Sequence, residues 1–134
     1  MGDADQHSAV RFVVIGVAHP HAIVLTAGLL EAGATCIGWV DTPDEHDGLF
    51  PALFPDLLAL TIEGALSAEP DLAVVAVVPD ERSRLSVEAM HAGADVLVAK
   101  PAVTNVAQLD DVADAVAATG KRWWVAFTEH FTSR

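Results

Sequence analysis

The sequence is poor in basic residues and in cysteine. It has 7 lysines and arginines against 19 aspartates and glutamates, which gives a formal net charge of −12 and a pI near 4.5. A chain with this charge repels polyanions, so we exclude DNA and RNA as partners. Its single cysteine, Cys36, cannot form an intramolecular disulfide or a cysteine-rich zinc site. This is compatible with a reducing compartment, and we expect the protein in the cytoplasm.

Long apolar runs and a charged leader are also missing. The longest apolar runs are the length of a strand, well short of the roughly 20 residues that a membrane-spanning helix needs. Residues 1–9 are polar and acidic and do not resemble a signal peptide, so we expect residues 1–10 to form a frayed tail. With 134 residues, of which 52% are hydrophobic, the chain fits one domain over residues 11–134.

From Arg11 onward, short runs rich in valine and isoleucine alternate with stretches whose apolar residues recur every three or four positions. This alternation is typical of a parallel sheet with helical crossovers. We expect strands at 12–15, 36–40, 57–60, 72–78, 95–99 and 122–128, and helices from Pro20 to Gly33, over 81–92 with Asp80 as N-cap, and from Val106 to Gly120. The spacing of apolar residues is weak over 49–66, where we expect a short helix capped by Thr61. The predicted fold class is α/β, a doubly wound, mostly parallel, Rossmann-like sheet of about six strands with helices on both faces.

In such a sheet, ligands bind beyond the carboxyl ends of the strands. The turn from Gly16 to His21 occupies the place of the G-x-G-x-x-G fingerprint, in which glycines let the backbone approach a pyrophosphate at a helix N-terminus. Only the first glycine is present. Ala18 still permits close approach, whereas His21 must alter the packing of helix and strand or point outward. The alternative is a plain β–α turn with two exposed histidines, and a metal site at His19 and His21 is disfavoured because no further soft ligand has an assured position.

Two other strand ends carry candidate ligand-binding residues. Asp41 follows the second strand, 25 positions after Gly16 (41 minus 16), near the spacing at which an acid binds the adenosine ribose hydroxyls of NAD. An aspartate there disfavours NADP, whose 2′-phosphate it would repel. Lys100 follows a strand and precedes Pro101, and a lysine in that place can bind an anion or a ribose or act as an acid or base. The alternatives are a solvated acidic loop that begins at Asp41 and a surface lysine.

Other features have structural explanations. Cys36 lies among apolar residues of a strand, where a buried cysteine is usually an inert small hydrophobe. Trp123 and Trp124 are adjacent in a strand and therefore point to opposite faces. We favour a role in the core alone, and the alternative is that one of them covers a missing domain or partner. The acids and the histidine within 44–47 indicate a solvated loop rather than a cation site. Residues 128–130, after the last strand, also belong to the ligand edge.

Four segments follow the order and spacing of a known family: Val74–Pro79, Ala89–Gly93, Val96–Pro101 and Val125–Phe127. The sequence resembles the N-terminal NAD(P)-binding Rossmann domain of the glucose-fructose oxidoreductase / inositol dehydrogenase / rhizopine-catabolism (Gfo/Idh/MocA) family, in a divergent branch with a His-Pro-His turn. The resemblance runs from Arg11 to the C-terminus, and the Lys-Pro pair is its most specific part.

The resemblance implies a role for each candidate residue. The pyrophosphate would be bound by Gly16, Ala18, His19 and His21, and the adenosine ribose by Asp41 and Thr42. Val78 and Pro79 would lie along the cofactor, and Lys100 and Pro101 would lie beside the nicotinamide ribose and the substrate, with Lys100 as the catalytic candidate. It also implies a cofactor, NAD rather than NADP, and hydride transfer on a sugar-like or polyol substrate. Family members carry a second α+β domain, which this chain lacks, so we expect the chain alone to be inactive.

Two competing functions remain open. The absence of the second domain and Ala99, in place of the family's glutamate before Lys100, favour a nucleotide-binding or interaction module without catalysis. A response-regulator receiver domain has a similar length and a Lys-Pro pair, but it needs an acidic pair where this chain has residues 16–18, Gly-Val-Ala. We expect a small-molecule cofactor and a small-molecule substrate as partners, and neither a membrane nor a metal ion. A homo-oligomer is one of the assemblies that the sequence leaves open.

Overall fold

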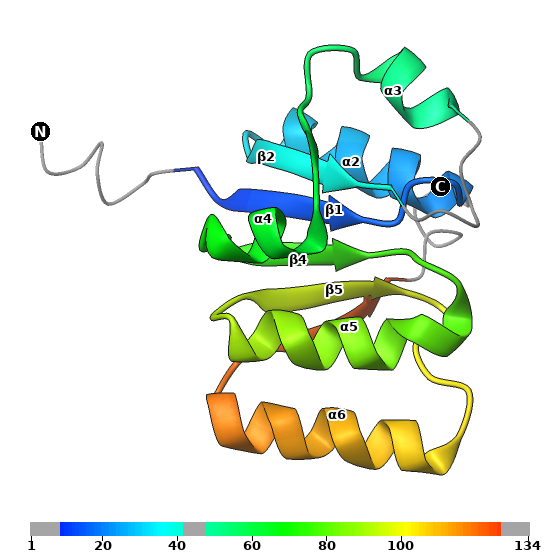
Figure 1. The fold of residues 1–134 in the computed structure, drawn as a ribbon, viewed down its shortest axis with the longest axis vertical. Helices are drawn as coiled ribbons and strands as arrows, with labels where there is room; N and C mark the ends of the chain where they lie inside the picture. Colours follow the sequence, from blue (N-terminus) through cyan, green and yellow to red (C-terminus); the bar gives the residue numbers. More distant parts are fainter. Residues whose placement is uncertain (1–8, 42–47, 127–134) are drawn as a thin grey trace, which may run out of the picture.

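Six strands pair into one sheet in the computed structural model, which describes residues 9–41 and 48–126 (Figure 1). The elements are β1 (Arg11–Ile15), α2 (Pro20–Glu31), β2 (Thr35–Val40), α3 (Leu49–Leu53), β3 (Ala59–Leu60), α4 (Ile62–Ser67), β4 (Leu72–Val75), α5 (Pro79–His91), β5 (Asp95–Ala99), α6 (Val106–Thr119) and β6 (Trp123–Ala126). All neighbouring strands are parallel, in the order β3-β2-β1-β4-β5-β6. This order confirms the Rossmann-like prediction and differs from the 2-1-3-4-5 order of receiver domains.

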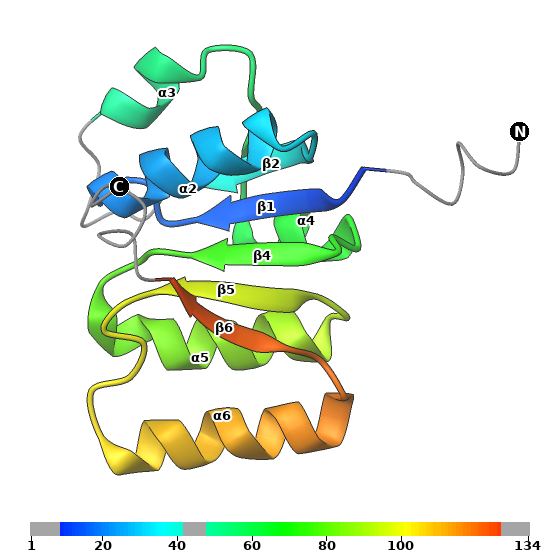
Figure 2. The same cartoon turned by 180° about the vertical axis from the view of Figure 1, so that it is seen from behind.

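Helices cover both faces of the sheet, as predicted (Figures 1 and 2). Strand side chains alternate between two apolar clusters because successive residues of a strand point to opposite faces. On one face, Val13, Val75 and Val98 belong to a cluster with residues of α4, α5 and α6. On the other face, Phe12 and Val74 belong to a cluster with residues of α2 and α3. The parallel sheet is therefore buried between two helical layers over its central strands.

A glycine in β2, Gly38, allows the edge strand β3 to approach β2 closely. The register of β1 against β2 shifts at a bulge, after which Val13 lies opposite Gly38. A Cβ atom at residue 38 would lie 2.6 Å from Cδ1 of Leu60 and 2.7 Å from the carbonyl oxygen of Leu58, distances that real Cβ contacts essentially never show. Gly38 is therefore required by the close approach of β3 to β2.

Several predicted boundaries are wrong. The strand predicted at 72–78 ends at Val75, and the helix predicted at 81–92 begins at Pro79 with Val78 as N-cap, so Asp80 lies in the first turn and is not the cap. Proline suits the first helical position because it has no N–H to leave unpaired. The strand predicted at 57–60 is only Ala59–Leu60, and α3 was not predicted at all.

The short helix after β3 is confirmed. Thr61 is the N-cap of α4, and its hydroxyl oxygen accepts the backbone N–H of Gly64 at 2.9 Å. The predicted side-chain directions in β6 are confirmed as well. Trp123 packs against the cluster on the α5 face, whereas Trp124, on the other face, is exposed. Helices α2 and α6 also lie close to their predicted bounds.

Parts of the sequence predictions fall on segments outside 9–41 and 48–126. These are most of the predicted tail 1–10, Thr42, the acidic loop 44–47, the end of the last predicted strand, and residues 128–130. Within the two described ranges, no helix is long and apolar enough to cross a membrane. The same ranges contain no group of three or more metal-ligating side chains.

Candidate functional site

The predicted site residues converge on one edge of the sheet. Strands β2, β1, β4 and β5 are parallel neighbours, so their carboxyl ends meet at the edge to which the arrowheads point in Figure 1. The turn 16–21 follows β1, Asp41 follows β2, Val78 and Pro79 follow β4, and Lys100 follows β5. Strand order reverses at β1, because the chain goes outward through β2 and β3 and then returns to β4. In open α/β sheets such a switch point is where ligands bind.

Gly16 is fixed by the packing of this edge. Its φ of +89° lies in the left-handed region, and a Cβ atom would lie 2.6 Å from both the backbone nitrogen and Cγ1 of Val77. Its N–H donates to the carbonyl oxygen of Val40 at 2.9 Å. The one surviving glycine of the fingerprint therefore brings the turn after β1 against the segment after β4 and the end of β2.

The turn after β1 presents free backbone donors. Among the described residues, no hydrogen bond uses the backbone N–H of Val17, Ala18 or His19. Pro20 has no N–H, and the N–H of Ala22 donates to the carbonyl oxygen of His19 at 3.0 Å. Three successive amides at the entrance to a helix suit an anion such as a pyrophosphate, since both the N–H groups and the helix dipole favour negative charge. The turn therefore fits a dinucleotide, although most of the fingerprint glycines are absent.

The two histidines of the turn are in contact with each other. Nδ1 of His19 accepts the backbone N–H of His21 at 3.2 Å, and the ring centroids lie 4.3 Å apart. Burial, and then the charges of His21 and Arg82, lower the pKa of His19, which agrees with a neutral ring that accepts at Nδ1. Both rings are partly buried, and Nδ1 of His21 is buried with no hydrogen-bond partner among the described residues. His21 therefore packs on its neighbour instead of pointing outward.

The remaining predicted residues border the same edge. Asp41 directly follows β2 and is partly buried, as is Lys100 after β5. The peptide bond between Lys100 and Pro101 is cis. Val78 is 40% exposed and caps α5, so an apolar side chain is open to solvent at this edge.

Arg82 of α5, which is not among the predicted site residues, binds the backbone at this edge of the sheet. It is 1% exposed, and its Nε donates to the carbonyl oxygen of Val77 at 2.7 Å. Its Nη1 donates to the carbonyl oxygens of Ala99 at 3.0 Å and Pro101 at 2.9 Å. The available signal was its spacing from Leu85 and Ala89, which places it on the buried face of α5.

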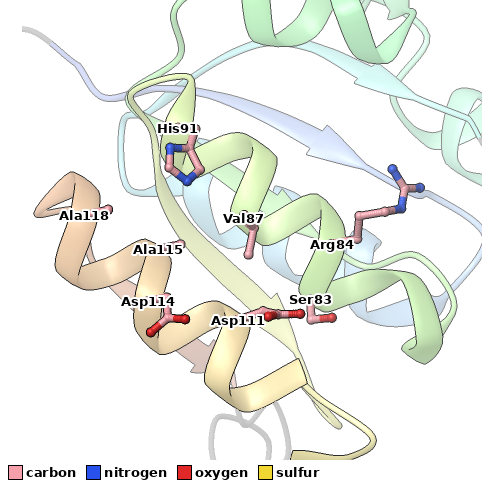
Figure 3. A pocket seen from close by; sticks show the side chains of 8 residues that line it. All are labelled: Ser83, Arg84, Val87, His91, Asp111, Asp114, Ala115 and Ala118. Atoms are coloured by element: carbon pink, nitrogen blue, oxygen red, sulfur yellow. The ribbon is translucent and has the colours of Figure 1, made fainter. Parts of the chain in front are cut away.

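A separate groove lies between α5 and α6 (Figure 3). It has a volume of about 530 Å³ and is lined by Ser83, Arg84, Val87, His91, Asp111, Asp114, Ala115 and Ala118. Figure 3 shows that the aspartates come from α6 and the basic side chains from α5. None of the predicted site residues lines this groove, so it is distinct from the candidate site.

Comparison with known proteins assigns the chain to a family. A profile described as "Oxidoreductase family, NAD-binding Rossmann fold" (Gfo/Idh/MocA) matches residues 39–127. A protein of Erwinia carotovora atroseptica SCRI1043, assigned to the oxidoreductases, is 35% identical with a TM-score of 0.84, over 90% of this chain and 37% of its own. No protein with a curated description matches.

More distant structures share the fold. An oxidoreductase of Desulfitobacterium hafniense DCB-2 has a TM-score of 0.78 at 16% identity, over 90% of this chain and 35% of its own. The WlbA dehydrogenase of Bordetella pertussis has a TM-score of 0.77 at 20% identity, over 88% and 36%. The chain thus spans little more than a third of these proteins. The profile match, which covers more than half of the chain, shows that the chain belongs to the Gfo/Idh/MocA oxidoreductase family, as an NAD-binding Rossmann domain.

Proposed function

We propose that this domain binds NAD(H) for an oxidoreductase that acts on a sugar-like or polyol substrate. The observation that carries the proposal is the row of free amides at residues 17–19, at the point where strand order reverses. In this assignment the backbone from Gly16 to His19 holds the pyrophosphate. His21 contributes its ring rather than its amide, because that amide already donates to His19.

The ends of β2, β4 and β5 supply the other contacts. Asp41, with Thr42 beside it in the sequence, accepts hydrogen bonds from the adenosine ribose hydroxyls, and this favours NAD over NADP. Val78 and Pro79 provide an apolar wall. Bound NAD(H) supplies a hydride donor or acceptor. Lys100 binds the neighbouring ribose or holds a proton at Nζ for the substrate oxygen, which makes it the catalytic candidate of this chain.

The distant relatives support the substrate class but divide on the cofactor. The Bordetella pertussis dehydrogenase was solved in complex with NADH and UDP-GlcNAcA, which is a nucleotide sugar. The Desulfitobacterium hafniense protein is described as NADPH-dependent. In this proposal the rest of the substrate pocket comes from the second domain that the family resemblance implies, because the chain spans 37% of its 35% identical relative.

The proposal is tested by titration with NADH and NADPH, following energy transfer to the nicotinamide from Trp39, Trp123 and Trp124. We expect saturable binding with NADH preferred. Equal or tighter binding of NADPH would contradict the preference, and binding of neither would favour the non-catalytic interaction module. Ala18→Asp places a carboxylate at the free amides and should weaken binding about tenfold or more, whereas Ala27→Asp adds the same charge on an exposed position of α2 and should not.

A further inference from the structure

We infer that Arg82 is the positioning residue of the cofactor site, and that it sets the backbone from which Lys100 projects. The inference rests on the proposed function, because it concerns the same site. Arg82 is not assigned contact with cofactor or substrate. It acts through the loops that follow β4 and β5.

The guanidinium of Arg82 binds the backbone on both sides of Lys100. A single nitrogen, Nη1, donates to the carbonyl oxygens of Ala99 and Pro101, the residues immediately before and after Lys100. Two carbonyls held by one nitrogen fix the path of the backbone through Lys100. The direction in which the lysine side chain leaves the loop follows from that path.

The same guanidinium connects this loop to the other strand ends. Its Nε donates to the carbonyl oxygen of Val77, after β4. Val77 in turn packs against Gly16 so closely that a Cβ atom at residue 16 would lie 2.6 Å from its backbone nitrogen. The contacts therefore run from the turn after β1 through Val77 and Arg82 to the loop after β5. Arg82 itself joins the segments after β4 and β5, and Val77 connects them to the turn proposed to hold the pyrophosphate.

Packing alone does not explain an arginine at this position. A buried cation has a large desolvation cost. Arg84, two residues later, is exposed and pairs with Glu81 and Glu88, so it serves as the control position. An arginine supplies a rigid, planar set of donors for three carbonyl oxygens, which an apolar side chain at position 82 could not supply.

The charge of Arg82 also affects the pKa of His19, which gives a second measurement that does not depend on NADH binding. Arg82 is one of the groups that lower the pKa of His19, after burial and His21. Removal of the charge should therefore raise the pKa of His19 toward its ordinary value of 6.5, whereas a lysine at position 82 should leave it low. NMR of the imidazole resonances as a function of pH measures this.

The test compares NADH affinity in the wild-type chain, Arg82→Met and Arg84→Met, below the unfolding temperature of each protein. We expect Arg82→Met to weaken NADH binding about tenfold or more, and Arg84→Met to change it by less than about twofold. Wild-type affinity in Arg82→Met would overturn the inference while the proposed function stands. Failure of the wild-type chain to bind either nucleotide would overturn the proposed function and the inference with it.

Arg82→Lys keeps the inference testable if Arg82→Met does not fold. The ammonium group keeps the charge, but it is compact and lacks the guanidinium fork that reaches Val77 and Pro101 together. We expect a folded protein with a low His19 pKa and NADH affinity still reduced about tenfold. Full affinity in Arg82→Lys would overturn the role assigned to the fork, because a cation would then suffice.

Discussion

The imidazole of His19 caps helix α2 by accepting the backbone N–H of His21 at Nδ1, 3.2 Å away. Serine, threonine, aspartate and asparagine are the usual N-cap residues, and their acceptors stay available across the neutral pH range. A histidine cap accepts only while the ring is neutral, because protonation converts Nδ1 into a donor. The first turn of α2 therefore depends on the protonation state of one side chain at the proposed pyrophosphate site.

We predict that this cap makes stability fall in mild acid. Burial, His21 and Arg82 lower the pKa of His19 below its ordinary value of 6.5. Below pH 6.5 the unfolded chain binds a proton at this residue that the folded chain resists, so the contribution is complete above that pH and is lost as the pH falls through the folded pKa. Urea unfolding at pH 8 and pH 5.5 measures the change in the free energy of unfolding.

His19→Asn is the matched control for that prediction. Asparagine is a good N-cap whose acceptor does not titrate, so contributions from the many carboxylates cancel when the two proteins are compared. We expect similar stabilities at pH 8, and a deficit of up to about 1 kcal/mol for the wild-type chain at pH 5.5. A difference between the proteins that does not change with pH would show that His19 is not the group responsible.

Gly16→Ala should destabilise the protein by about 2–4 kcal/mol. The substitution combines a left-handed φ of +89° with a Cβ atom 2.6 Å from the backbone of Val77, which cannot move away without disturbing the end of β4. Gly28→Ala is the control, because nothing lies within 4 Å of its Cβ and it lies within the helical residues of α2. That substitution should stabilise the protein by up to about 1 kcal/mol. Urea unfolding of both variants checks the prediction, and equal effects would contradict it.

The fold was predictable because its sequence patterns are regular. The apolar runs that become β1 and β5 have strand length and are separated by stretches of helical spacing, so strand number and parallel topology followed. The end of β4 was not predictable in the same way. Val74 to Val78 is one apolar run, and hydropathy does not show that pairing stops at Val75 while the next residues turn toward α5.

The site was only partly predictable, for related reasons. Gly16, Asp41 and Lys100 could be placed at the ligand edge because they directly follow strands. The role of Arg82 depends on three carbonyl oxygens from two loops, and no local pattern records where those carbonyls point. The free amides of residues 17–19 likewise result from the conformation of the turn and not from the identity of its side chains.

Cys36 should be nearly unreactive in the folded protein. Burial raises the pKa of its thiol from 9.0 to about 11, so the thiolate fraction at pH 8 is about 100-fold lower than for the unperturbed thiol. We expect a disulfide reagent such as DTNB to label Cys36 slowly in buffer and rapidly in urea, with the slow rate increasing with pH as the thiol ionises. Rapid labelling of the folded chain at neutral pH would contradict this and would reopen a chemical role for the residue.

Asp41→Ala tests the cofactor preference. If Asp41 accepts hydrogen bonds from the ribose hydroxyls, its loss should weaken NADH binding about tenfold or more, because hydrogen bonds to a charged group are among the stronger ones. NADPH should bind no more weakly than before, since a carboxylate that repels the 2′-phosphate has been removed. Asp110→Ala is the control, because it removes the same charge from an exposed position on α6. Fluorescence titrations with both nucleotides give the two affinities for each protein. An equal loss for NADH and NADPH in Asp41→Ala would show that Asp41 supports the turn around it without reading the ribose.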